Sequence, residues 1–303
     1  MTITSTLLRL PGDGVTLAAE RWDPETTTRK GTILLLHGGG QTRHSWQRTG
    51  LRVAENGWRA FAIDARGHGD SEWAADGDYS PDSHARDLAR VVASLDEPPV
   101  LVGASMGGMA ALLAQAADPH LGRALILVDI TPRAEPEGLA KIHAFMRSGL
   151  AGFDTLADVL AAVVAYNPNR TRAPRVEGLR KNLRLRDGKW YWHWDPRLLE
   201  HRENGPEQAE ASEIRARAAA RAITVPTLLI RGAQSEVVST QGADDLLTLV
   251  PGARHIEVSG AGHMVSGDDN DVLGAGLLDF LADCVPPIAT APGDDYDLPH
   301  RAR

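Results

Sequence analysis

One five-residue stretch constrains the fold of this chain more than any other. Residues 99–103 form a short apolar run, Gly103-Ala104-Ser105-Met106-Gly107 overlaps its end, and a helix-forming stretch follows at once. The central residue of so tight a turn is forced into strained backbone angles, and its neighbours two positions away must lack bulk so that strand and helix can pass closely. The pattern predicts that the turn lifts the Ser105 hydroxyl clear of a sheet and points the first amides of the helix at whatever binds there.

Short apolar runs alternate with helical patterns on both sides of this turn. Strands are predicted at residues 3–10, 15–22, 32–36, 59–63, 99–103, 124–128, 226–230 and 254–258, and helices at 44–56, 81–96, 106–117, 240–249 and 271–283. The first two strands are joined by Pro11-Gly12-Asp13-Gly14, which is typical of a hairpin turn. Near-continuous apolar strands that alternate with helices indicate an α/β fold with a mostly parallel sheet covered by helices on both faces.

The alternation stops after Pro132, and the next predicted strand begins at Pro226. Residues 133–221 are rich in Ala and Arg and are predicted to be largely helical, with no convincing strand. We therefore predict a discontinuous core of residues 1–132 and 222–285, a helical cap or lid of residues 133–221, and a loose tail of residues 286–303. An insertion at the carboxyl end of a strand sits over the edge of the sheet where ligands bind.

Composition excludes several classes of function. The 303 residues carry a net charge of −8 without a broad basic excess, which argues against nucleic acid as a partner. Cys284 is the single cysteine, so no internal disulfide can form, and a reducing compartment fits. No basic leader and no apolar run long enough for a membrane span is present in the sequence. We expect a cytoplasmic protein with a small-molecule substrate, no membrane partner, no cofactor and no metal; a monomer and a homodimer remain open.

Four stretches together carry a family resemblance: His37-Gly38-Gly39, the loop Asp64 to Ser71, Gly103-x-Ser105-x-Gly107 and Gly260-Ala261-Gly262-His263. Through their order and spacing the chain resembles the α/β-hydrolase superfamily from about residue 15 to residue 284. The resemblance implies an eight-stranded sheet, a Ser–acid–His triad and a cap domain. It also implies that the Asp64–Ser71 loop buttresses its neighbours rather than reacts. It names no substrate, because this fold hosts many chemistries.

Ser105 is the predicted nucleophile and His263 its base. A serine hydroxyl is weakly nucleophilic at neutral pH and needs a neighbouring base to remove its proton. His263 follows the last predicted strand in a glycine-containing turn that can carry an imidazole toward Ser105. The chain order of serine, acid and histidine matches the hydrolase pattern.

The acid has two candidates. In many hydrolases of this kind it follows the seventh strand as Gly-x-x-Asp, but here that place is Gly232-Ala233-Gln234-Ser235-Glu236. Ser235 cannot carry a negative charge, and Glu236 comes one position late. Asp129 directly follows a buried strand at the same sheet edge, an arrangement that some members of the superfamily resemble. We favour Asp129, which can hold the imidazole tautomer and stabilise the imidazolium, with Glu236 as the alternative.

The remaining candidates concern the oxyanion and the substrate. The amide of Met106, together with that of Gly39, is predicted to form the oxyanion hole, with Gly40 as an alternative donor that could also line the pocket. The insertion contains three tryptophans close together: Trp190, Trp192 and Trp194. Two interpretations are equally supported. The rings form an aromatic wall over the substrate pocket, or they pack the cap against the core.

These residues favour a serine hydrolase that cleaves a small-to-medium carboxylic ester or lactone through an acyl-enzyme. Amide, C–C bond and cofactor-free peroxide chemistry are alternatives on a similar triad. A ligand-sensing protein that keeps the triad but turns over slowly is a third hypothesis, from another class of function.

Overall fold

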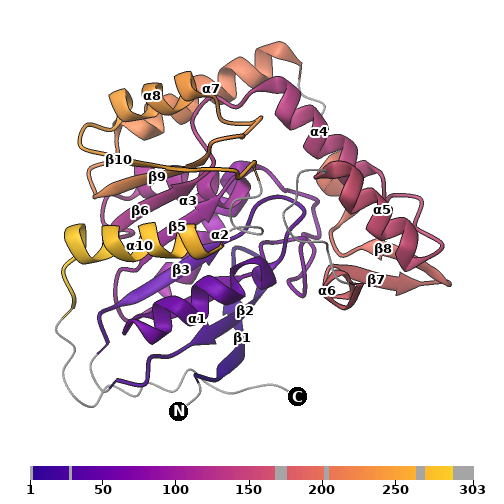
Figure 1. Cartoon of the computed structure of the whole chain (residues 1–303), viewed down its shortest axis with the longest axis horizontal. Coiled ribbons are helices and arrows are strands. Elements are labelled where there is room, and N and C mark those ends of the chain that lie inside the picture. The colour runs from indigo at the N-terminus through magenta and orange to yellow at the C-terminus, as the bar shows by residue number, and fades with distance from the viewer. Residues whose placement is uncertain (1–2, 27–28, 168–175, 201–204, 264–269, 289–303) are drawn as a thin grey trace.

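The computed structural model of the chain describes residues 3–26, 29–167, 176–200, 205–263 and 270–288. Within these ranges the fold is built on an eight-stranded sheet with the order β1-β2-β4-β3-β5-β6-β9-β10 (Figure 1). The pairs β1–β2 and β2–β4 are antiparallel and all other neighbours are parallel. The strands are β1 (Ser5–Pro11), β2 (Thr16–Trp22), β3 (Thr32–Leu36), β4 (Arg59–Ile63), β5 (Val100–Ala104), β6 (Ala124–Val128), β9 (Thr227–Gly232) and β10 (Arg254–Val258). The predicted α/β fold with a mostly parallel, eight-stranded sheet is confirmed.

Helices cover both faces of the sheet because its central strands are apolar on both sides. Every residue of β5, β6 and β9 is buried. Alternate side chains divide between two cores: Ile33 and Leu35 of β3 face one, and Leu34 faces the other. Helices α1 (Gln47–Glu55) and α10 (Asn270–Cys284) contribute to the first core, and α2 (Pro81–Ala93), α3 (Met106–Ala117) and α8 (Thr240–Leu249) to the second.

The segment between β6 and β9 begins beside the sheet, on the right of Figure 1, and returns to the body with its last helix. Its elements are α4 (Pro136–Arg147), α5 (Leu156–Tyr166), α6 (Val176–Arg180), β7 (Leu183–Arg186), β8 (Lys189–Trp192), the short helix η2 (Pro196–Leu199) and α7 (Pro206–Arg221). Helix α7 contacts α3 and α8 of the body, so the chain has rejoined the core layer before residue 221. The limits of the cap, 133–221, stay a prediction.

The expectation that this segment holds no strand was wrong. β7 and β8 form an antiparallel hairpin joined by Asp187 and Gly188, whose φ angles are 48° and 78°. Positive φ at both positions is characteristic of the two-residue turn that Asp-Gly sequences favour, because this turn matches the twist of the flanking strands. Each strand has only four residues, too few for the alternation of side chains to stand out in the sequence.

The hairpin and the residues after it are fastened to the body. Arg184 of β7 pairs with Asp70 at 2.6 Å, and Asp195 accepts a 2.5 Å hydrogen bond from the hydroxyl of Tyr79. Both contacts reach loops that leave the carboxyl end of β4. At the other end of the chain, the tail predicted for residues 286–303 lies mostly outside the described residues. Ile288 donates its amide to the carbonyl of Lys30.

Candidate active site

Ser105 stands on a strained turn between β5 and α3. Its backbone angles are φ 46° and ψ −113°, a conformation that side-chain-bearing residues rarely adopt. A Cβ at Gly103 would lie 2.5 Å from the carbonyl oxygen of Gly107, and one at Gly107 would lie 2.6 Å from that of Leu36. No side chain fits at either position, so the two glycines are what allow strand and helix to pass. Strain retained on such a turn is typical of functional sites.

The glycine loop after β3 lies directly beside this turn. A Cβ built at Gly38 would be 3.4 Å from the Cβ of Ser105. The amide of Gly40 donates to Nε2 of His68 at 3.3 Å, so it is already engaged by the loop after β4. This bond favours Gly39 over Gly40 as the partner of Met106 in holding an oxyanion. Met106 is the first residue of α3 and directly follows Ser105 in the chain.

Asp129 lies at the end of β6, next to the strand that carries Ser105. The amide of Ser105 donates to the carbonyl of Val128, so the two strand ends are in register. Asp129 itself has φ 50° and is 1% exposed. Its Oδ2 lies 2.7 Å from Nδ1 of His263, which comes from the turn after β10. A buried carboxylate on Nδ1 fixes the tautomer that leaves Nε2 free to act as a base.

Two further donors hold the Asp129 carboxylate. The amide of Gly232 donates to Oδ1 at 2.9 Å, and the hydroxyl of Ser235 donates to Oδ2 at 2.5 Å. A Cβ at Gly232 would lie 2.4 Å from the carbonyl oxygen of Gly262, so glycine is needed where the end of β9 meets the turn that carries His263. Sequence reasoning missed the role of Ser235, although its place in Gly232-x-x-Ser235 was the available signal.

Glu236, the alternative acid, has a different partner. Its carboxylate pairs with Lys141 of α4 at 2.6 Å, and both side chains are more than half exposed. The structure therefore brings Asp129, and not Glu236, to the imidazole of His263.

The three tryptophans of the insertion make packing contacts. Trp192 and Trp194 are stacked with ring centroids 5.1 Å apart, and both are buried. Trp190 is half-buried beneath the guanidinium of Arg180, 5.4 Å from its ring centroid. A Cβ at Gly40 would be 3.5 Å from the ring of Trp194. Trp194 thus packs on the glycine loop, the point at which the insertion approaches the predicted oxyanion hole.

Three buried histidines join the insertion to this loop. The rings of His37 and His68 have centroids 5.1 Å apart, and those of His68 and His193 are 5.8 Å apart. Each ring accepts a backbone amide: that of Ala65 on His37, Gly40 on His68 and Gly69 on His193. Burial lowers the pKa of all three, and the pKa of His68 and of His193 is held well below the usual value.

Lowering the pH should therefore reduce the free energy of unfolding, because these three rings are buried. Neighbouring charges act on the same pKa values in addition to burial. Asp64 raises and Arg43 lowers the pKa of His37, and Arg184 lowers the pKa of His193. Since burial holds the pKa of each ring below its ordinary value of ~6.5, the unfolded chain binds more protons than the folded chain as the pH falls through that value. The free energy of unfolding should then fall by up to ~1.4 kcal/mol per pH unit for each such ring. Urea unfolding between pH 7.5 and 5 measures this slope.

A His193→Asn variant is the matched control, because its Oδ1 stands where Nδ1 of the histidine accepts the Gly69 amide and the side chain takes up no proton. Its stability should depend less steeply on pH than that of the wild type. Equal slopes for the two proteins would contradict the assignment.

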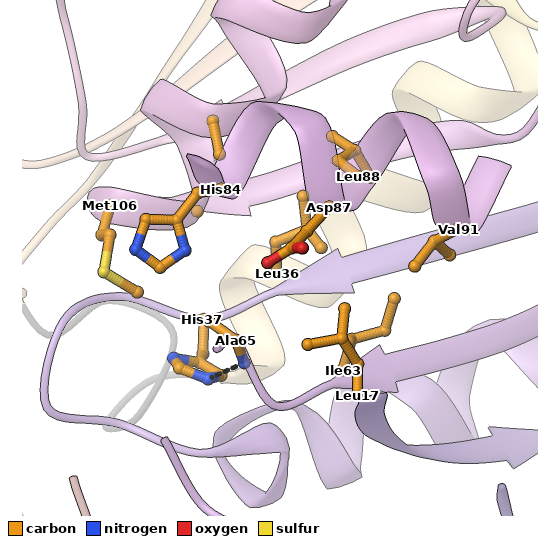
Figure 2. A pocket seen from close by; sticks show the side chains of 12 residues that line it. Leu17, Leu36, His37, Ile63, Ala65, His84, Asp87, Leu88, Val91 and Met106 are labelled. Carbon is orange, nitrogen blue, oxygen red and sulfur yellow. Dashed lines mark hydrogen bonds between the residues drawn. The ribbon is translucent and has the colours of Figure 1, made fainter. Parts of the chain in front are cut away.

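A small cavity lies behind the Ser105 turn, between α2 and the sheet. It has a volume of about 40 Å³ and is lined mainly by apolar side chains, including Leu17, Ile63 and Val91. Figure 2 shows His84 and Met106 at one end of it, with His37 and its bond to Ala65 below. The carboxylate of Asp87, which pairs with Arg66, also borders this cavity.

The chain is similar to known proteins over most of its length. The alpha/beta hydrolase fold family matches residues 31–269. An esterase of Mycobacterium tuberculosis, Rv0045c, is 31% identical over 249 residues, 78% of each chain. Its crystal structure superposes with a TM-score of 0.68 over 91% of this chain and 92% of that chain. The 2-(acetamidomethylene)succinate hydrolase of Mesorhizobium japonicum is 26% identical over 82% of this chain and 87% of its own.

A crystal structure of E-2-(acetamidomethylene)succinate hydrolase gives a TM-score of 0.77 at 23% identity, covering 92% of this chain and 100% of that one. The chain belongs to the alpha/beta hydrolase fold family. Across the ranges that the structure describes, no helix is long and apolar enough to cross a membrane. The same residues include no group of three or more His, Cys, Asp or Glu side chains placed to hold a metal ion.

Proposed function

We propose that this protein is a serine hydrolase that cleaves a small-to-medium carboxylic ester or lactone through an acyl-enzyme. The observation that carries the proposal is the 2.7 Å contact between His263 and the buried Asp129, at the sheet edge where Ser105 stands on its strained turn. The likeness to a mycobacterial esterase supports the choice of an ester bond.

The reaction divides into two proton-coupled steps. His263 takes the proton of Ser105 as the hydroxyl oxygen attacks the substrate carbonyl, and the amides of Gly39 and Met106 stabilise the negative oxygen. The carbon–oxygen bond of the ester then breaks, and His263 returns the proton to the departing alcohol. Water, deprotonated by the same imidazole, attacks the acyl-enzyme and releases the acid, which restores Ser105. Asp129 stays ionised and stabilises the imidazolium in both steps.

The insertion is assigned to the substrate side of this site. We propose that residues 133–221 form the cap, with Trp194 on the glycine loop as its contact nearest to the chemistry. A cytoplasmic location is proposed from the single cysteine, which suits a reducing compartment.

A fluorophosphonate probe tests the nucleophile directly. The purified protein should gain the mass of one adduct, and peptide mapping should place it on Ser105, because the activated hydroxyl displaces fluoride from phosphorus. Ser105→Ala should gain none, and a panel of p-nitrophenyl esters and lactones then defines the preferred bond. A wild-type protein that stays unlabelled, or that is labelled at another serine, would refute the proposal.

A further inference from the structure

The hydroxyl of Ser235 lies beside the Asp129 carboxylate, a contact that the residues around Ser235 in the sequence do not predict. It stands at the fourth position of Gly232-Ala233-Gln234-Ser235, in the turn after β9. The turn is clamped to the loop that carries His263, since Ala233 donates to the carbonyl of Val258 and Gln234 to that of Ala261. Ser235 and His263 are therefore held on one bonded unit, facing the end of β6.

The hydrogen bonds of Ser235 fix the direction of its proton. Its oxygen accepts the amides of Val237 at 3.2 Å and Val238 at 3.0 Å. A hydroxyl has two acceptor sites and one proton, so both acceptor sites are occupied and the proton is left for Asp129 Oδ2, 2.5 Å away. That oxygen is the one that faces Nδ1 of His263.

We propose that Ser235 is a positioning residue for the reaction, which acts by holding the Asp129 carboxylate against His263. This inference rests on the proposed function, since it concerns the orientation of the base. Asp129 has two oxygens, and without the hydroxyl only Gly232 would fix one of them from the backbone. A neutral donor also suits this place electrostatically, because a second carboxylate beside Asp129 would raise the cost of ionising either group.

The same carboxylate has no competing local role in the structure. An Asp that caps the following turn would accept amides from the next residues, but the Asp129 carboxylate bonds to residues 232, 235 and 263. The next polar side chain, Thr131, donates instead to the carbonyl of Arg133. Ser235 therefore donates to the same carboxylate oxygen, Oδ2, that faces His263.

The test compares Ser235→Ala with Ser239→Ala. Ser239 lies in the same loop, but its hydroxyl caps α8 by accepting the amide of Gly242. Each variant loses one hydroxyl that accepts backbone amides, so a purely structural effect should be similar in the two. We expect Ser235→Ala to lower kcat for a p-nitrophenyl ester about 10-fold with KM unchanged, and Ser239→Ala to leave kcat within about twofold. Ser235→Thr, which keeps the hydroxyl, should restore most of the lost kcat.

A double-variant cycle shows whether the effect passes through Asp129. In an Asp129→Asn background, the additional Ser235→Ala change should alter the rate of fluorophosphonate labelling by less than about twofold, because the carboxylate it positions is gone. An unchanged kcat in Ser235→Ala, equal losses in the two serine variants, or fully additive effects in the cycle would each overturn the inference. The proposed function fails separately, through a wild-type chain that is not labelled at Ser105.

Discussion

Asp129→Asn is expected to lower kcat for ester hydrolysis by about 10⁴-fold while the fold is retained. The Asp129 carboxylate accepts three hydrogen bonds, from Gly232, Ser235 and His263. An asparagine has only one acceptor oxygen, and the backbone amide of Gly232 cannot reverse its direction. The asparagine oxygen should therefore remain on Gly232 and present its NH₂ group to His263. The imidazole then accepts at Nδ1 and carries its proton on Nε2, which is the wrong tautomer for a base.

Glu236→Gln is the matched control for this change. It makes the same carboxylate-to-amide replacement at the other candidate acid, whose side chain is 59% exposed and paired with Lys141. Exposed ion pairs contribute little, so its kcat should stay within about twofold of the wild type. Steady-state kinetics with p-nitrophenyl butyrate measure kcat of each variant, and circular dichroism shows whether each variant is folded. A collapse of kcat in Glu236→Gln with a normal Asp129→Asn would move the acid to Glu236.

The sheet could be predicted from the sequence because its strands are short apolar runs followed by distinctive turns. The order of Ser105, Asp129 and His263 along the chain also limited the possible site. The sequence favoured Asp129 as the acid but left Glu236 as an alternative, since the direction of the Glu236 side chain depends on the turn after β9. That turn directs Glu236 to Lys141 and Ser235 to Asp129. No periodicity in the sequence reports the direction of a loop side chain.

The contacts that attach the insertion to the body could not be predicted either, because they join residues far apart in the sequence. His193 lies between tryptophans in a short, mostly aromatic stretch, and its partner amide belongs to Gly69, which is 124 positions away. Arg184 and Asp70 are separated by 114 positions. Contacts of this kind depend on how two segments meet after folding. The β7–β8 hairpin differs, because its Asp187-Gly188 turn was a local signal that the length of the segment obscured.

Asp87→Ala is expected to reduce the free energy of unfolding by about 3–5 kcal/mol. Asp87 of α2 binds Arg66 through both oxygens, with Nε and Nη2 each at 2.7 Å. The two side chains are only 6% and 3% exposed. Removing the carboxylate leaves a buried guanidinium that keeps only the carbonyls of Asp78 and Asp13. It also enlarges the cavity of Figure 2, which Asp87 borders. Urea unfolding at pH 7.5 measures the loss.

Asp82→Ala, on the same helix, separates burial from pairing. Asp82 also binds an arginine through both oxygens, but it and Arg215 are about half exposed. Water replaces the partner of an exposed charge, so this variant should lose no more than about 1 kcal/mol. Arg66 lies in the loop between β4 and α2, and His68 of the same loop accepts the amide of Gly40 in the glycine loop, so Asp87→Ala should also lower kcat. Similar losses of stability in the two variants would show that the buried pair is not a main support of this loop.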